Sequence, residues 1–170
     1  MSVRLRPLGA ILAAAGVMLL GGCASQSISW GGLGGSEPPP AQPAATLLPA
    51  SIPAADLVGR WGLAAYHNEA DRGRTEAAAR GQCRNPYTIG RGGSGGVIMH
   101  LADQAQPTEL SLKGGADGKN YIGPPDEPAP GQRDREIVSF DGRVLITRFV
   151  DKDAAVRYGN MVYVRCAPRA

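Results

Sequence analysis

The chain has little net charge and few aromatic side chains. The first shortage bears on whether it binds nucleic acid, and the second on how its core is filled. Its 18 Lys and Arg residues face 15 Asp and Glu residues, which leaves a net charge of +3 and no basic cluster. Such a balance does not attract nucleic acid, so we predict no nucleic-acid partner. Aromatic residues make up 5% of the chain, so few large side chains are present to fill a core.

The motifs of common enzyme classes are also missing. The chain has no CxxC pair for a metal, no Gly-Lys-Ser/Thr for a nucleotide phosphate, and no serine in a nucleophile elbow. A G-x-G-x-x-G match at 90–95 precedes a strand pattern, whereas a dinucleotide site requires a helix there. We interpret it as a hairpin loop. The sequence therefore predicts no enzymatic activity, no catalytic residue, no cofactor and no metal.

Two histidines are the remaining candidates for acid–base chemistry. His100 precedes Asp103 by three residues, and His67 precedes Glu69 and Asp71. Either could be drawn as an acid–base pair. We interpret His100 as a half-exposed or hydrogen-bonded strand residue, and His67 as a residue at a strand-to-helix junction.

The N-terminus carries the most specific pattern. Arg4 and Arg6 precede an apolar run at 8–20, which has the length of a signal peptide and is too short to span a membrane. The sequence LGGC at 20–23 follows and resembles the lipobox of bacterial lipoproteins. This resemblance implies removal of residues 1–22 and lipidation of Cys23. The alternative is an ordinary secretory signal with an unrelated cysteine.

The residues after Cys23 predict a tether. Residues 24–55 contain one charged side chain, Glu37, among Gly, Ser, Ala and Pro, so they cannot bury enough apolar surface to fold. We predict a disordered tether over 23–55 and a folded domain over 56–170. Because Ala24 rather than an aspartate follows the lipidated cysteine, the resemblance implies an outer-membrane anchor. We predict separately that the domain faces the periplasm, with surface display as the alternative.

With Cys23 assigned to lipid, Cys83 and Cys166 form an even pair. An exported protein is expected to oxidise such a pair to a disulfide. The bridge would close a loop of about 83 residues, which the chain-entropy estimate credits with roughly 4.5 kcal/mol. Val162, Val164 and Cys166 alternate on one face of a strand, which predicts that Cys166 turns inward.

The folded region predicts one helix and eight strands. Asn68 is a candidate N-cap for a helix over 69–80, with small residues at 70, 73 and 77 suited to packing on a sheet. Asp141-Gly142 separates two apolar runs, which favours a type I′ turn. The predicted strands, bounded by Gly, Pro or Asp, are 60–66, 87–89, 97–101, 109–113, 120–122, 135–140, 143–150 and 161–165.

We predict that these strands close into a small antiparallel barrel, since closure removes exposed edges; a two-sheet sandwich is the alternative. Gly59-Arg60-Trp61 at the start of a short exported barrel resembles the lipocalin-like (calycin) superfamily. It is also similar to small periplasmic barrels of the Inh type, which inhibit metalloproteases. The Inh pattern places a cysteine pair soon after its tryptophan, and this chain departs from that pattern.

These expectations leave two functions open. The domain is either a module that binds an apolar ligand or inhibits a protein, or a structural envelope component that contacts neighbouring proteins. A cavity of ~300 Å³ or more favours the first, and a filled interior favours the second. The mixed charges at 133–136 are interpreted as a solvated edge, with a partner-binding rim as the alternative.

Overall fold

The structure, a computed structural model, describes residues 47–166. Two helices, α1 (Arg72–Gly81) and α2 (Lys152–Tyr158), accompany three 3-10 turns: η1 (Ala54–Asp56), η2 (Glu69–Asp71) and η3 (Gln82–Arg84). No helix in this range is long and apolar enough to cross a membrane. The predicted lipidation site, Cys23, and the tether up to residue 46 lie outside the described residues. The strands are β1 (Leu48–Pro49), β2 (Gly59–Tyr66), β3 (Tyr87–Arg91), β4 (Val97–His100), β5 (Pro107–Gly114), β6 (Asn120–Gly123), β7 (Arg135–Phe140), β8 (Val144–Phe149) and β9 (Asn160–Arg165).

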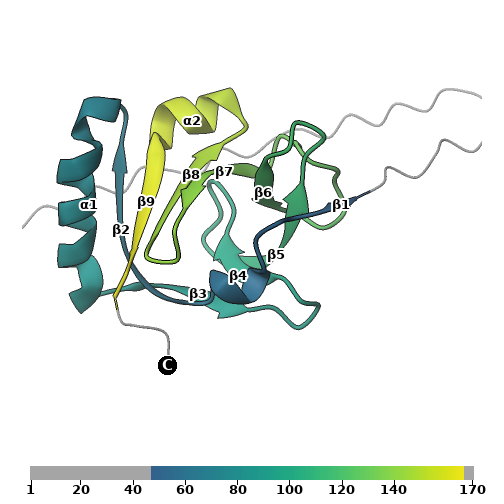
Figure 1. Cartoon of the computed structure of the whole chain (residues 1–170), viewed down its shortest axis with the longest axis horizontal. Coiled ribbons are helices and arrows are strands. Elements are labelled where there is room, and N and C mark those ends of the chain that lie inside the picture. The colour runs from purple at the N-terminus through teal and green to yellow at the C-terminus, as the bar shows by residue number, and fades with distance from the viewer. Residues whose placement is uncertain (1–46, 167–170) are drawn as a thin grey trace, which may run out of the picture. The chain divides into compact units, whose positions relative to one another are not determined.

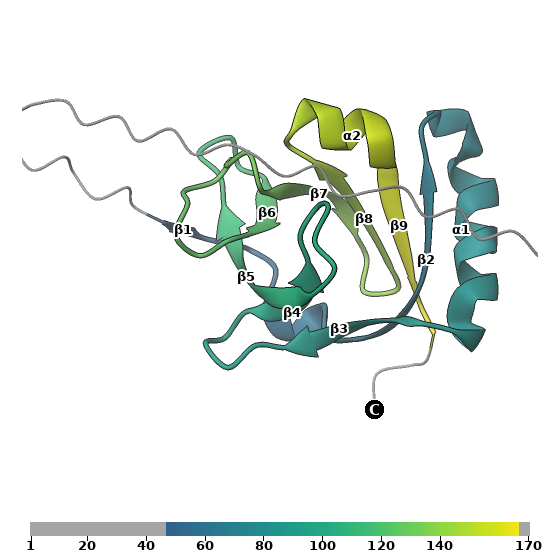
Figure 2. The same ribbon diagram turned by 180° about the vertical axis from the view of Figure 1, so that it is seen from behind.

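Eight of these strands form a closed antiparallel barrel. Each strand from β2 to β8 pairs with the next one along the chain, and β9 pairs with β2 to close the ring. The meander can be followed in Figures 1 and 2. The prediction of a closed barrel is confirmed. Closure provides a ladder partner for strands that would otherwise lie at a sheet edge.

Strand β1 extends the folded region beyond its predicted start. Leu48 and Pro49 pair with Gly114 and Lys113 of β5, and the backbone N–H of Ser51 donates to a side chain of β6 at 2.8 Å. Residues 48–51, which lie in the predicted tether, therefore contact the barrel. The physical reason is that β4 pairs only with 107–110 of β5, which leaves the rest of that edge for β1.

The barrel interior is filled by side chains that alternate along the strands. Trp61 and Tyr163 are the largest of them, and both are almost completely buried. Because alternate residues of a strand point to opposite faces, every second apolar residue faces this core. The cluster consists of Leu57, Trp61, Ile89, Val97, Met99, Leu110, Ile122, Ile137, Leu145 and Tyr163.

Helix α1 covers the outer face of β2 and β9 (Figure 1). Its buried side chains are Thr75 and Ala79, and Ala79 packs with Val162 and Val164 outside the barrel. A Cβ at Gly62 would lie 1.9 Å from the carbonyl oxygen of Ala79, so this close approach requires glycine. The predicted packing face was wrong. Its small residues are exposed instead: Ala70, Gly73 and Ala77.

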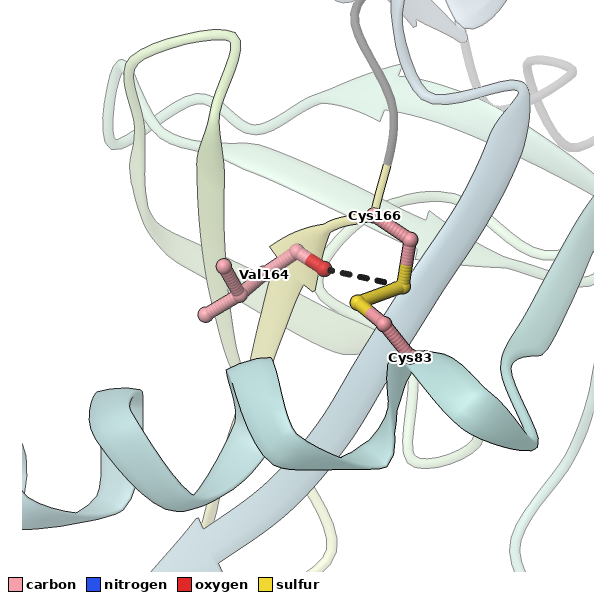
Figure 3. The surroundings of a disulfide bond; sticks show 3 residues. All are labelled: Cys83, Val164 and Cys166. Atoms are coloured by element: carbon pink, nitrogen blue, oxygen red, sulfur yellow. Dashed lines mark hydrogen bonds between the residues drawn. A yellow bond between two sulfur atoms is a disulfide. The ribbon is translucent and has the colours of Figure 1, made fainter.

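A disulfide fastens the end of α1 to the end of β9. The Sγ atoms of Cys83 and Cys166 lie 2.07 Å apart, with their Cα atoms 5.3 Å apart, as the sequence predicts (Figure 3). The Sγ of Cys166 also lies 3.9 Å from the carbonyl oxygen of Val164. Cys166 shares a face with the valines as expected, but that face is the helix-covered outside of the barrel rather than its interior.

Two local features differ from the sequence expectations. Of the turn residues Asp141 and Gly142, only Gly142 has a positive φ, at 85°, whereas a type I′ turn needs both. The Asp141 carboxylate instead accepts the backbone N–H groups of residues 143 and 144 at 2.8 and 2.6 Å. Helix α2 is not among the predicted elements; Asp151 caps it by accepting the N–H of Ala154 at 2.7 Å.

Candidate ligand-binding site at the barrel mouth

One end of the barrel is plugged. Trp61 is fully buried there, and its Nε1 donates to the carbonyl oxygen of Leu57 at 2.9 Å. The guanidinium of Arg165 stacks 4.0 Å from the indole ring and donates to the carbonyl oxygens of Asp56 and Val58 at 2.6 and 3.1 Å. These contacts satisfy the Trp61 indole N–H and bring carbonyl oxygens onto the Arg165 guanidinium.

The other end, where α2 lies, opens into a cavity of about 370 Å³. Its walls come from β2, β3, β7, β8 and β9, the last residue of β4, the segment at 101–105 between β4 and β5, and the last residue of α2. A smaller hollow of about 220 Å³ adjoins it and shares the residues at 101–104 and Phe149. The main cavity is lined by Leu63, Tyr87, His100, Leu101, Ala102, Asp103, Gln104, Ala105, Arg135, Phe149, Tyr158, Met161 and Tyr163.

Arg135 is the cation of this cavity. It opens β7 in phase with Ile137 and pairs with Ile122 of β6, both of which face the core, so the period of two directs it inward. It is 4% exposed. Its Nη2 donates to the carbonyl oxygen of His100, its Nη1 lies 3.4 Å from the Tyr163 hydroxyl, and its guanidinium lies 4.8 Å from the Phe149 ring centre. Its Nε is buried and has no hydrogen-bond partner.

Three aromatic side chains, Tyr87, His100 and Tyr163, add polar atoms to the cavity lining. The Tyr87 ring lies 5.7 Å from both the His100 and the Tyr163 rings. The Tyr87 hydroxyl accepts the backbone N–H of His100 at 3.0 Å and lies 3.2 Å from its Nδ1. Burial raises the pKa of the Tyr163 phenol, so it stays protonated at neutral pH and can donate as well as accept.

A latch of three side chains joins the two sides of the mouth. Both Asp103 oxygens accept from Arg157 Nη1 at 2.7 Å, and the Tyr158 hydroxyl donates to the same carboxylate. These hydrogen bonds, first that of Tyr158 and then that of Arg157, hold the pKa of Asp103 below its usual value. Tyr158 also packs on Phe149, with ring centres 5.3 Å apart. The latch therefore connects the segment after β4 to α2 and neutralises the one carboxylate of the lining.

The two candidate histidines lie in different places in the structure. His100 lies in the cavity lining, half-buried and hydrogen-bonded as interpreted from the sequence, while Asp103 bonds to Arg157 rather than serving as its acid partner. His67 lies at the strand-to-helix junction, where its Nε2 is 3.0 Å from the carbonyl oxygen of Val156. The structure brings neither histidine into a catalytic pair with a carboxylate among the described residues.

The glycine-rich segment is the β3–β4 hairpin loop, as predicted. The N–H of Gly92 donates to the carbonyl oxygen of Gly96 at 2.9 Å. The Glu109 carboxylate accepts the N–H groups of Ser94 and Gly96 at 2.8 and 3.0 Å. Because the protein's own carboxylate occupies these donors, the loop has no free amide cradle at these two positions.

The interpretation of 133–136 as a solvated edge was wrong for its two central residues. Asp134 is fully buried on the outer side of the barrel, where it accepts from Lys113 Nζ at 2.6 Å. Arg135 is buried inside. The missed signal was the phase of Arg135 with Ile137, which places a charge in an inward position of the predicted strand.

The mouth is thus apolar on its walls and cationic at its base. Compared with models of protein families, with curated proteins and with solved structures, the chain matches none. The functional argument therefore rests on the residues of the mouth alone.

Proposed function

We propose that the protein is a lipid-anchored envelope lipoprotein whose barrel domain binds a small ligand at its mouth. The observation that carries the proposal is the cavity of about 370 Å³ above a packed floor. Its volume lies within the ~300–1,000 Å³ range of ligand pockets. Apolar walls with a few polar groups at the base are the usual composition of such sites.

The anchor is the second part of the proposal. The lipobox-like sequence that ends at Cys23 supports attachment to the outer membrane, with the barrel domain in the periplasm. Stable attachment needs more than one acyl chain, and a lipoprotein cysteine carries three. The test is metabolic labelling with a fatty-acid analogue: Cys23→Ser should lose the label, and label retained in this variant would remove the anchor from the proposal.

A substitution at the rim tests ligand binding. Ala105 is exposed and lines the cavity, so Ala105→Trp places an indole in the mouth without disturbing the core. Ala78→Trp is the matched control, because Ala78 is exposed on α1 outside the cavity. We expect native mass spectrometry of envelope-extracted protein to find a small molecule bound to the wild type and to Ala78→Trp, and to find it lost from Ala105→Trp. If neither the wild type nor Ala78→Trp carries a bound small molecule, that result would count against the proposal.

A structural envelope component is the second candidate. The observation that favours it is the filled interior, in which ten buried side chains occupy the barrel below the mouth. In that case the outer surface would hold the function. Chemical cross-linking in intact envelopes would then capture a neighbouring protein equally well with the wild type and with Ala105→Trp.

A further inference from the structure

We infer that the mouth of the barrel recognises a monoanionic carboxylate with a compact apolar body, an inference that rests on the proposed ligand-binding function. Arg135 is the residue that carries it. A buried charge is costly unless it is paired, and cations in protein interiors usually have a carboxylate or phosphate partner. Among residues 47–166, the partners of this guanidinium are a carbonyl, a phenol and an aromatic ring, and none is a carboxylate.

Arg135 lacks hydrogen-bond acceptors as well as a negatively charged partner. A guanidinium has five N–H donors in a planar fork. The Nε is buried with no acceptor, which has a desolvation cost that the barrel does not offset. A carboxylate at the base of the cavity would supply both the negative charge and oxygen acceptors in the planar geometry that matches the fork.

The surrounding groups favour a single negative charge. Arg135 is the cation of the cavity lining, and the one lining carboxylate, Asp103, is already bonded to Arg157. A dianion would therefore bring a second negative charge that no further cation of the lining compensates. The Tyr163 hydroxyl, which lies 3.4 Å from the guanidinium, is placed to donate a further hydrogen bond to the same anion.

The walls define the rest of the ligand. Leu63, Phe149 and Met161 give the cavity an apolar surface. Its volume of about 370 Å³ is more than twice the ~150 Å³ of an engineered cavity that holds a benzene ring. A short aliphatic chain or a single ring with a few methylene groups fits this space.

Matched acids and alcohols test the inference. The probes are 4-phenylbutyrate and 4-phenylbutanol, with octanoate and octanol as a second pair, titrated calorimetrically into the folded protein at neutral pH. We expect an acid to bind more tightly than its alcohol. Arg135→Met should weaken binding of the acid by about 10- to 100-fold, the range for hydrogen bonds to charged groups, and leave the alcohol nearly unchanged.

Arg148→Met is the control for the loss of an arginine. Arg148 lies on the neighbouring strand β8 and is exposed, and it pairs outside the barrel with Glu136 at 2.9 Å. This variant should bind the acids like the wild type. If circular dichroism shows that Arg135→Met does not fold, Tyr163→Phe replaces it, with an expected loss of about 3- to 10-fold for the acid.

The outcomes separate this inference from the proposed function. Equal affinity for acid and alcohol, lost in Ala105→Trp, would overturn the carboxylate and leave the binding site standing. Unchanged acid affinity in a folded Arg135→Met protein would also overturn it, as would an absence of binding by all four probes. The proposed function is judged independently, by the molecule that does or does not co-purify from the envelope.

Discussion

Replacement of Lys113 by methionine should destabilise the domain more than any other single lysine change. Lys113 points to the outside of the barrel, yet it is 2% exposed, because the segment between β6 and β7 covers it. Its ammonium group donates to Asp134 Oδ1 at 2.6 Å and to the carbonyl oxygens of Pro124 and Glu127 at 3.1 and 2.9 Å. All three of its protons are thus used.

The magnitude follows from what Lys113→Met leaves behind. The Asp134 carboxylate would stay fully buried, with the N–H of Gly131 at 2.7 Å as its remaining side-chain hydrogen bond. Removing one partner of a buried pair costs about 3–5 kcal/mol, because the other charge is left uncompensated. Since urea m-values of small domains are ~1–3 kcal/mol/M, the urea midpoint should fall by about 1 M or more.

The assay is urea unfolding followed by far-ultraviolet circular dichroism. Lys119→Met is the control, because Lys119 is half-exposed and pairs with Glu136 at 3.1 Å, and exposed pairs contribute less than about 1 kcal/mol. The double variant Lys113→Met with Asp134→Leu should recover part of the loss, since an apolar pair replaces the ionic one. A cost for Lys113→Met as small as that of the control would refute the reasoning.

Three further predictions concern the disulfide, the helix contact and the latch. Cys83→Ala and Cys166→Ala should lower the free energy of unfolding by similar amounts, up to roughly 4.5 kcal/mol, and the double variant should be little worse; equilibrium unfolding checks this, and strongly additive losses would contradict it. Gly62→Ala should cost about 1–3 kcal/mol, because its Cβ would lie 1.9 Å from a helix carbonyl oxygen. Gly73→Ala, with open space around it, should instead gain about 0.5–1 kcal/mol by the same measurement. An NMR titration should give Asp103 a pKa below its ordinary value of 3.8, so the latch contributes stability above the unfolded-state pKa and loses it as the pH falls through the lowered one; a value at or above 3.8 would show that the latch does not form.

The candidate site was only partly predictable. His100 and Asp103 drew attention as titratable neighbours, and both line the cavity. The residue that defines its chemistry, Arg135, looked like one member of a surface charge run. Helix α2 supplies Tyr158 and Arg157, and it was not among the elements predicted from the sequence. The latch therefore could not be predicted. Each of these contacts joins residues far apart in the chain, and local patterns carry no information about such pairs.

The sequence by itself determined the elements of the barrel. All eight predicted strands occur, because alternating apolar residues bounded by Gly, Pro and Asp favour extended segments wherever they fold. The pairing of Cys83 with Cys166 was predicted from their number and the predicted export of the chain, and the structure has the same pair.

Only the tertiary structure decided which faces are covered. An alternating pattern states that Lys113 and Leu112 point to opposite sides, but not that the 124–134 segment folds over the lysine and buries it. Likewise, the composition of α1 permits several packing faces. Gly62 on β2 selects the one with Ala79, because only a residue without a side chain admits the helix backbone there. Burial depends on what lies opposite a residue, and the opposite partner is fixed only when the ring of strands closes.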